Sequence, residues 1–335
     1  MENVKSILPG FLIVVVTALF VRLLSYFSLP IPEVMLGMVT GVILGNLFTL
    51  PQKYEAGLIF CYNIILKTAI VLLGFKIYLS DIINIGGSAL MLISISFTLA
   101  LVLSFFLGRM FKIPKKMAAL IGVGTAVCGN TAIVAVAPCI SATKVETSFA
   151  IATNTVFGML AIFLFPAIGR YLGLSNEFFG LWSGIAINDT SQVLAASFSY
   201  SEVALDFATT VKLTRNSLLG LVVIIMTYIF RENTGQKKTG LGRIFKLPLF
   251  VILFLLVSTF NSFGGREFLM KISPHFLSYN KEVIKFCILM ALTGIGFTTH
   301  LKAMFKIGFR PFVFGLLLAT LLSAFNYIAI ATIIF

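Results

Sequence analysis

Long apolar runs separated by short polar connections form the main pattern of this chain. Five of the runs carry no charged residue, and they cover 82–108, 117–143, 147–169, 247–265 and 311–335. A helix needs roughly 20 mainly apolar residues to cross the hydrocarbon layer of a bilayer. Since each run is close to that length or longer, each predicts a membrane-spanning helix.

Apolar segments that contain single charges extend this pattern over the rest of the chain. With these segments included, the sequence predicts an all-α, polytopic membrane bundle of about eleven helices in a single domain over 1–335. The predicted spans lie near 8–27, 33–50, 57–78, 83–109, 116–140, 147–169, 178–199, 207–230, 246–262, 282–302 and 311–334.

Composition supports the same class. Hydrophobic residues make up 59% of the chain and charged residues 11%, whereas charged residues make up about 25% of a soluble protein. The sequence has no metalloprotease, phosphate-binding-loop, nucleophile-elbow or haem-attachment pattern, and its four cysteines lack metal-ligand spacing. We therefore expect neither an enzyme nor a bound cofactor or metal.

The net charge of +13 is explained by orientation in the membrane and does not indicate nucleic-acid binding. Basic residues gather in the connections near 109–116, 231–246 and 302–310, and even numbers of predicted spans separate these connections. All three therefore face one side, which the positive-inside rule identifies as the cytoplasm. The N-terminus is then expected in the cytoplasm and the C-terminus outside.

Two internal similarities suggest a duplicated bundle. Residues 74–86 and 296–308 share Gly, Phe, Leu, Ile and Gly at equivalent positions without a gap. These segments run in opposite senses under the predicted topology, as the inverted repeats of secondary transporters do. A second match, of 126–135 with 186–195, divides the chain differently. The sequence favours a duplication but leaves its partition open, and chance similarity among apolar helices is the competing explanation.

Two polar, glycine-bearing stretches lie inside apolar runs, at 122–131 and 184–192. Hydrocarbon offers no hydrogen-bond partners, so irregular backbone at membrane depth survives only where protein or a water-filled cavity receives it. Both stretches therefore predict interrupted helices, and a third interruption is expected at 293–299.

The first stretch predicts an anion site. Its glycines weaken the helix, and a break would free backbone N–H groups at the start of a second half-helix, where the helix dipole favours negative charge. Close packing through small residues is the alternative. The candidate ligands in this stretch are Thr125, Cys128, Gly129, Asn130 and Thr131.

The second stretch contains an acid, Asp189, whose burial at mid-membrane costs several kcal/mol (roughly 2.5 or more) without a partner. Lys212 and Arg215 lie one turn apart on the following span and share a helix face. They form either a structural ion pair with Asp189 or a cationic site for a substrate anion, with Asp189 exchanging a proton or setting the charge. Polar candidates around the acid are Asn188, Thr190 and Gln192.

Secondary candidates lie on two other predicted spans. Lys67 is central in the third span and either extends to the interface or faces the protein interior, where it would add positive potential. Thr298 lies in the third predicted interruption.

Three motifs in order, over almost the whole chain, resemble the prokaryotic family of proposed sulfate exporters. They are Cys128–Ile133 followed by Pro138, Gly184–Val193, and Val211–Arg215, with Leu73–Phe75 and Asp81 in addition. The resemblance implies a carrier of sulfate or a related oxyanion in the plasma membrane of a prokaryote. A histidine commonly precedes the acid in that family, and Asn188 stands here, so a proton mechanism that used this histidine would not be shared.

The leading functional prediction is a secondary transporter of a small anion that works by alternating access without ATP hydrolysis. The first alternative is a sodium- or proton-coupled carrier of organic anions, in which carbonyl groups of the interrupted helices bind the cation. The second is a membrane receptor or scaffold that binds a ligand without moving it. The expected partners are the lipid bilayer, a small inorganic or organic anion and a coupling proton or sodium ion. The sequence is compatible with a homo-oligomer and leaves the oligomeric state open.

Overall fold

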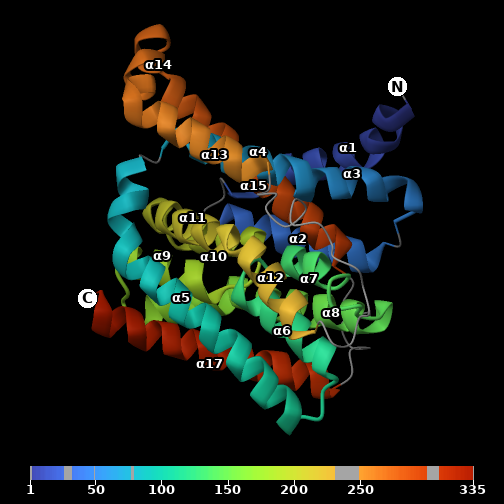
Figure 1. The fold of residues 1–335 in the computed structure, drawn as a ribbon. Helices are drawn as coiled ribbons and strands as arrows, with labels where there is room; N and C mark the ends of the chain where they lie inside the picture. The colour runs from blue at the N-terminus through green and yellow to red at the C-terminus, as the bar shows by residue number, and fades with distance from the viewer. Residues whose placement is uncertain are drawn as a thin grey trace. The chain divides into compact units, whose positions relative to one another are not determined.

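A computed structural model describes residues 2–25, 32–48, 50–76, 79–230, 249–299 and 309–334, and these form helices joined by short turns (Figure 1). Six helices are long and apolar enough to cross a membrane, and Glu33–Leu47 and Ile252–Gly265 are shorter apolar helices. No strand occurs in the described ranges. The predicted all-α class is confirmed, and helix is present at each predicted span.

The helices belong to two compact units, each assembled from two stretches of the chain. The first unit combines Met1–Ile83 with Leu249–Ala303, and the second combines Asn84–Pro248 with Met304–Phe335. The candidate residues Lys67 and Thr298 belong to the first unit, whereas 122–131, 184–192 and 207–230 all belong to the second. The fold therefore brings the two main polar stretches into the same unit.

The first unit contains four predicted spans and part of a fifth. Its helices are α1 (Glu2–Ser25), α2 (Glu33–Leu47), η1 (Gln52–Tyr54), α3 (Glu55–Phe60), the π-helical turn η2 (Cys61–Ile65), α4 (Leu66–Leu73), α13 (Leu249–Phe260), the second π-helical turn η5 (Asn261–Gly265), α14 (Arg266–Ile272) and α15 (Phe276–Thr298). The repeat segment at 296–308 lies largely outside the described residues.

Helix α15 is continuous through 293–298 and ends there, with Thr299 extended, so the interruption expected at 293–299 does not occur before the last of these residues. Its glycines serve close packing instead, because a Cβ atom on Gly296 would lie 2.4 Å from the Met38 carbonyl oxygen of α2. The threonines add no break either, since the Thr293 hydroxyl donates to the Leu289 carbonyl of its own helix at 2.8 Å. Small and hydroxyl-bearing residues thus allow two helices to approach without unwinding.

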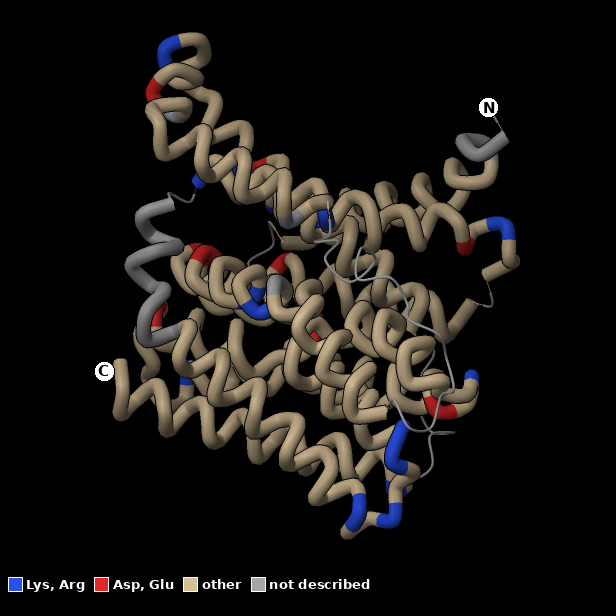
Figure 2. Tube along the Cα trace, viewed as in Figure 1, with Lys and Arg blue, Asp and Glu red and all other residues tan. Residues whose placement is uncertain are grey.

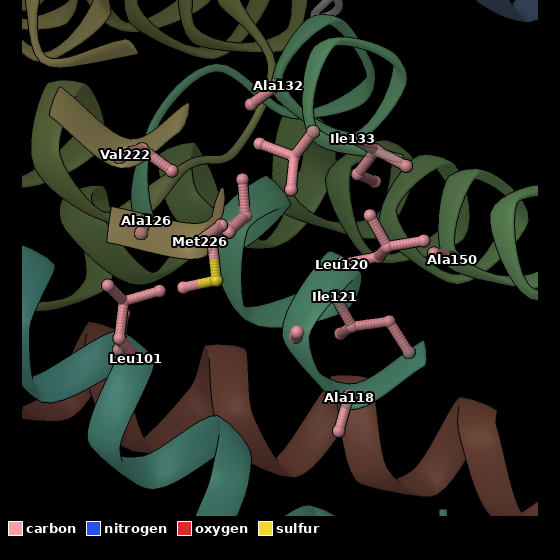
Figure 3. Packing of buried hydrophobic residues seen from close by; sticks show 14 of the residues in the cluster. Leu101, Ala118, Leu120, Ile121, Ala126, Ala132, Ile133, Ala150, Val222 and Met226 are labelled. Carbon is pink, nitrogen blue, oxygen red and sulfur yellow. The ribbon is translucent and has the colours of Figure 1, made fainter. Parts of the chain in front are cut away.

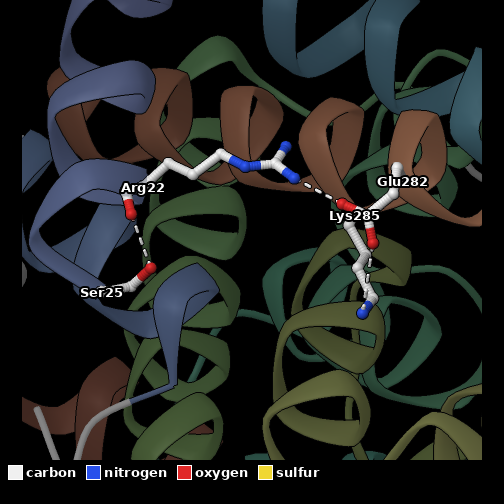
Figure 4. Close-up of polar contacts among 4 residues, drawn as sticks. All are labelled: Arg22, Ser25, Glu282 and Lys285. Carbon is white, nitrogen blue, oxygen red and sulfur yellow. Dashed lines mark hydrogen bonds and ion pairs between the residues drawn. The ribbon is translucent and has the colours of Figure 1, made fainter. Parts of the chain in front are cut away.

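An ion-pair cluster ties α1 to α15 within the first unit (Figure 4). Arg22, near the end of α1, pairs with Glu282, near the start of α15, and Lys285 lies 3.8 Å from the same carboxylate. The C-terminal end of α1 and the N-terminal part of α15 therefore lie at the same level. This antiparallel arrangement agrees with the predicted alternation of spans.

The second unit contains the interrupted helices. Its elements are α5 (Leu79–Met110, which begins in the first unit), α6 (Lys115–Ala126), α7 (Asn130–Val136), α8 (Lys144–Tyr171), α9 (Asn176–Ala186), α10 (Thr190–Tyr200), α11 (Glu202–Ser217), α12 (Leu219–Ile229) and α17 (Phe309–Ile333). Lysine and arginine gather at the turn between α5 and α6 (Figure 2). The basic connections at 231–246 and at 302–308 lie outside the described residues.

Apolar side chains of α5, α6, α7, α8 and α12 fill the core around the first interruption (Figure 3). Leu120 and Ile121 of α6, Ile133 of α7 and Met226 of α12 are all almost fully buried there. Because the alternative to this burial in a bilayer is contact with lipid, close van der Waals packing of these side chains holds both half-helices in place. The polar break between them is consequently held in a rigid frame.

Candidate functional site

The first interruption separates α6 from α7. Helix α6 ends at Ala126, Val127 leaves the helical region with φ −122° and ψ −92°, and Gly129 adopts φ +64° and ψ −129°. The two half-helices have 12 and 7 residues, so at 1.5 Å per residue neither spans a hydrocarbon layer of about 30 Å by itself. The turn thus lies at depth within the predicted fifth span.

The second interruption separates α9 from α10, and an acidic residue starts the second half-helix. Helix α9 ends at Ala186, and Ile187 is extended. The Asp189 carboxylate then accepts hydrogen bonds from the amide of Ser191 at 3.0 Å and from its hydroxyl at 2.7 Å. The Asp189 amide donates to the Gln192 side chain at 3.2 Å. This reciprocal capping box satisfies backbone donors that the start of a helix leaves free.

The two interruptions lie against each other inside the second unit. A Cβ atom on Gly129 would lie 3.0 Å from the Asn154 side-chain nitrogen, 3.1 Å from a carboxylate oxygen of Asp189 and 3.2 Å from its Cα. Glycine is therefore required at this point both by its left-handed φ and by the approach of the second break. The fold brings the two polar stretches predicted from sequence into direct contact.

Lys212 of α11 is the centre of this contact. Its ammonium group donates to the carbonyl oxygens of Val127 at 2.9 Å and Ile187 at 3.0 Å, and also to the carbonyl of Asn188. The side chain is 0% exposed. Three carbonyl oxygens around one amine match the three donors of an ammonium group, whereas a neutral amine would direct a lone pair at one of them. The surroundings therefore suit the charged form.

Arg215 performs the same task one turn further along α11. Its guanidinium is 3% exposed and donates to Thr125 O at 2.6 Å, Ala126 O at 3.2 Å and Gly184 O at 3.2 Å. It also donates to the carbonyls of Ile185 and Ile187. These carbonyls belong to the last turns of α6 and α9, or follow them, where carbonyl oxygens lose their helical partners. The two cations thus cap both C-terminal ends and offset their negative dipoles.

The ion pair that one sequence interpretation expected between Asp189 and these cations is absent from the described residues. The salt bridges found there involve Arg22, Glu282 and Lys285. The physical reason is that both cations are already occupied by main-chain carbonyls, while Asp189 caps α10. Each charged group stabilises one helix end of the appropriate sign.

A ladder of amide side chains extends from the second break across α8 to α7. Asn188 donates to Asn154 at 2.9 Å, Asn154 donates to Asn130 at 2.9 Å, and Asn130 donates to the Thr155 hydroxyl at 3.0 Å. Thr155 in turn donates to the Ile151 carbonyl at 2.8 Å. The ladder joins both interruptions to an unbroken helix.

Three members of this site were not among the residues predicted from sequence. Asn154 and Thr155 come from α8, and Asn216 of α11 donates to the Thr190 hydroxyl at 3.3 Å. A signal for the first was available, because Asn154 is the single amide side chain in the predicted span 147–169. An amide inside an otherwise apolar span needs a partner.

The remaining predicted residues are distributed as follows. The Thr125 hydroxyl donates to Ile121 O of its own helix at 2.9 Å, Cys128 is a buried free thiol, and Thr131 is exposed on α7. In the other unit, Lys67 donates to Asn63 and lies 6.0 Å from the Phe250 ring centroid. The Thr298 hydroxyl donates to carbonyls of its own helix. Within the described residues, no group of three potential metal ligands occurs.

Comparison with known proteins places this arrangement in a family. A family profile described as "Conserved hypothetical protein 698" matches residues 9–315. A "UPF0324 membrane protein" of Streptococcus agalactiae serotype V is 31% identical over 93% of both chains, and one of Clostridium tetani is 32% identical over 95% of both. A third, of Streptococcus pneumoniae, is 35% identical over 82% of both.

No solved structure matches the chain. The family match and the relatives each cover most of the sequence, and the relatives carry the name of membrane proteins, in agreement with the apolar helices described above. This chain therefore belongs to the conserved hypothetical protein 698 family and is a membrane protein.

Proposed function

We propose that this protein is a secondary transporter of a small anion, working by alternating access without ATP hydrolysis and without enzymatic activity. The observation that carries the proposal is the contact between two interrupted helices around two buried cations. Interrupted helices that meet at depth are the usual binding architecture of secondary transporters. We place the protein in the plasma membrane of a prokaryote, with the N-terminus in the cytoplasm and the C-terminus outside.

The sign of the local charge supports an anion. The C-terminal ends of α6 and α9 carry about half a negative charge each, and the N-terminal ends of α7 and α10 carry about half a positive charge each. Because these contributions cancel, the side chains decide the sign. Lys212 and Arg215 outnumber Asp189, which leaves about one positive charge near the breaks. Oppositely charged solute would be attracted there and would offset it.

Candidate donors for this anion lie on the accessible side of the breaks. Asn130 and Thr190 are half-buried, and Thr131 is exposed. No side chain caps the first amides of α7. In this proposal Lys212 and Arg215 act on the anion mainly through the field they create and through the helix ends they hold, since the three donors of Lys212 and most of those of Arg215 are occupied by carbonyls.

The same contacts argue against a sodium-coupled carrier in which carbonyl groups of the interrupted helices bind the cation. That alternative required free carbonyl oxygens at the interrupted helices to coordinate the cation. The carbonyls of residues 125–127 and 187–188 accept hydrogen bonds from Lys212 and Arg215 instead. Placing Na⁺ among them would add a third positive charge beside two fixed ones, at a large electrostatic cost in a medium of low dielectric.

Replacing Asp189 by asparagine tests the coupling role of this acid. Asparagine caps helices about as well as aspartate, so the free energy of unfolding should change by less than about 1 kcal/mol. In proteoliposomes, the purified variant should still exchange labelled anion across the membrane. Its accumulation of anion driven by a pH gradient should be at least about tenfold lower than that of the parent, because the group proposed to exchange the proton is gone.

Glu146→Gln is the matched control, since Glu146 is a half-buried member of the capping box at the start of α8 and lies outside both breaks. It should leave gradient-driven accumulation unchanged. If no anion moves through the parent protein under any gradient, the transporter proposal fails, and tight binding without flux would identify a receptor. Unchanged coupling in Asp189→Asn would remove the role of the acid.

A further inference from the structure

The direction of the amide ladder leaves one buried oxygen without a partner. The Thr155 hydroxyl donates its single proton to the Ile151 carbonyl. Its oxygen must therefore accept the hydrogen bond from the Asn130 nitrogen. The Asn130 oxygen then faces a nitrogen of Asn154, and the Asn154 oxygen faces a nitrogen of Asn188. The amide oxygen of Asn188 is therefore fixed as the free end of the ladder.

Exchanging the positions of the oxygen and nitrogen of Asn188 does not satisfy the ladder. After such a flip, its oxygen would face the Asn154 oxygen. Reversing Asn154 and Asn130 as well would set the Asn130 oxygen against the Thr155 oxygen, or would require the Thr155 hydroxyl to give up its bond to the Ile151 carbonyl. The Asn188 oxygen has no hydrogen-bond partner in the protein and its side chain is 1% exposed. A buried acceptor in this state costs about 1–3 kcal/mol.

A second unpartnered oxygen lies at the same break. Asn216 follows Arg215 on α11 and donates to the Thr190 hydroxyl at 3.3 Å, while its amide oxygen has no partner and its side chain is 3% exposed. Two buried acceptors thus flank the start of α10, one from the break itself and one from the helix that carries both cations. Such groups require a hydrogen-bond donor or a cation.

Charge decides between these two kinds of partner. Lys212 and Arg215 leave the breaks with a positive balance, which opposes a metal cation and favours an anion. An oxyanion without a proton has only hydrogen-bond acceptors. It would place its own oxygens against the two amide oxygens, and no hydrogen bond could form between them. An oxyanion that carries its own O–H group presents negative charge to the cationic region and a donor to the orphaned oxygens.

We infer that the site selects oxyanions bearing a hydroxyl proton, such as hydrogen phosphate or bicarbonate, over fully deprotonated ones such as sulfate or nitrate. This inference rests on the proposed anion transport and names its substrate class. In this inference the O–H group donates to Asn188 Oδ1, which the ladder fixes as an acceptor. Sites built to bond a substrate hydroxyl discriminate strongly against analogues that lack it, because the buried group is then left unpaired.

Two matched pairs of inorganic anions test the inference on the full-length protein in detergent. At mildly alkaline pH, hydrogen phosphate and sulfate share charge and tetrahedral shape, and bicarbonate and nitrate share charge and planar shape. Each pair differs in one O–H group. Isothermal titration should give at least about tenfold tighter binding for the hydroxyl-bearing member of a pair, and competition against labelled flux in proteoliposomes should give the same order.

Asn188→Leu removes the orphaned acceptor at similar volume and should reduce the preference to about twofold or less. Asn326→Leu is the matched control, because Asn326 of α17 is also a buried amide without a partner but lies outside the ladder. Its preference should equal that of the parent. Should Asn188→Leu not fold, Asn216→Leu replaces it, and the comparison of anion pairs on the parent protein decides without any variant.

The outcomes separate this inference from the proposed function. Anion flux with equal affinity within both pairs overturns the inference, since a resident water would then partner the amide oxygens, but keeps the transporter. A preference that survives in Asn188→Leu and in Asn216→Leu also overturns it. Absence of binding and flux for all four anions counts against the transporter proposal itself.

Discussion

Lys212→Met is expected to destabilise the folded protein by about 3–5 kcal/mol, because each buried acceptor that loses its donor costs about 1–3 kcal/mol. Methionine has a similar length but no donor, so three buried carbonyl oxygens, of Val127, Ile187 and Asn188, lose their shared partner. Each unsatisfied buried group is costly. The negative ends of α6 and α9 would also lose one of their two neutralising charges.

The free energy of unfolding is compared through the midpoint of denaturant or thermal unfolding in detergent, with circular dichroism as the signal. Lys67→Met is the matched control, since it makes the same change in another predicted span. Lys67 is half-buried and its ammonium group donates to the single exposed amide of Asn63, so the cost should stay below about 1 kcal/mol. Equal destabilisation by the two substitutions would contradict the capping role of Lys212.

This role explains which part of the site could be predicted from sequence. The interrupted segments were recognisable because glycine, threonine, asparagine and aspartate cluster inside apolar runs, and hydrocarbon does not tolerate such backbone without partners. The shared helix face of Lys212 and Arg215 was equally visible from their spacing. What the two cations bind was not, since the carbonyls of 125–127 and 184–188 reach them only through the packing of α11 against both breaks.

The expected third interruption shows how the same residue types can have two meanings. Glycine and threonine at 293–299 resemble the composition of the true breaks, yet α15 is continuous through Thr298. The difference lies in the neighbour: Gly296 meets the backbone of α2, so its missing side chain is used for close packing. Local composition does not reveal whether a helix will be approached by another helix or by an unwound segment.

The ladder residue Asn154 was missed for a related reason. It stands alone in an apolar helix, without glycine or neighbouring acids, and forms no pattern of its own. Its importance comes from Asn130, which begins α7, and from Asn188, which lies in the break between α9 and α10. A polar residue in the membrane predicts that a partner exists, but the identity of the partner is a property of the tertiary structure.

Gly129→Ala is expected to cost about 3 kcal/mol of folding free energy and to abolish anion flux. The backbone of Gly129 has φ +64° and ψ −129°, a conformation that costs an L-residue on the order of 1–3 kcal/mol. The added methyl group would also lie 3.2 Å from the Asp189 Cα and 3.0 Å from the Asn154 nitrogen. Since the first of these is backbone, the two breaks would have to move apart, and the donors and charges of the site would separate with them.

Gly173→Ala distinguishes the two contributions, because the chain offers a second left-handed glycine without neighbours. Gly173 has φ +62°, and a Cβ atom there would meet nothing within 4 Å. Its substitution should cost about 1 kcal/mol from the backbone alone and leave flux at the parental level. The excess cost of Gly129→Ala over Gly173→Ala, measured by unfolding in detergent, then reports the contact between the two breaks together with the added backbone cost at the ψ of −129°. If both variants lose the same stability and both transport normally, that contact contributes nothing to holding the site together.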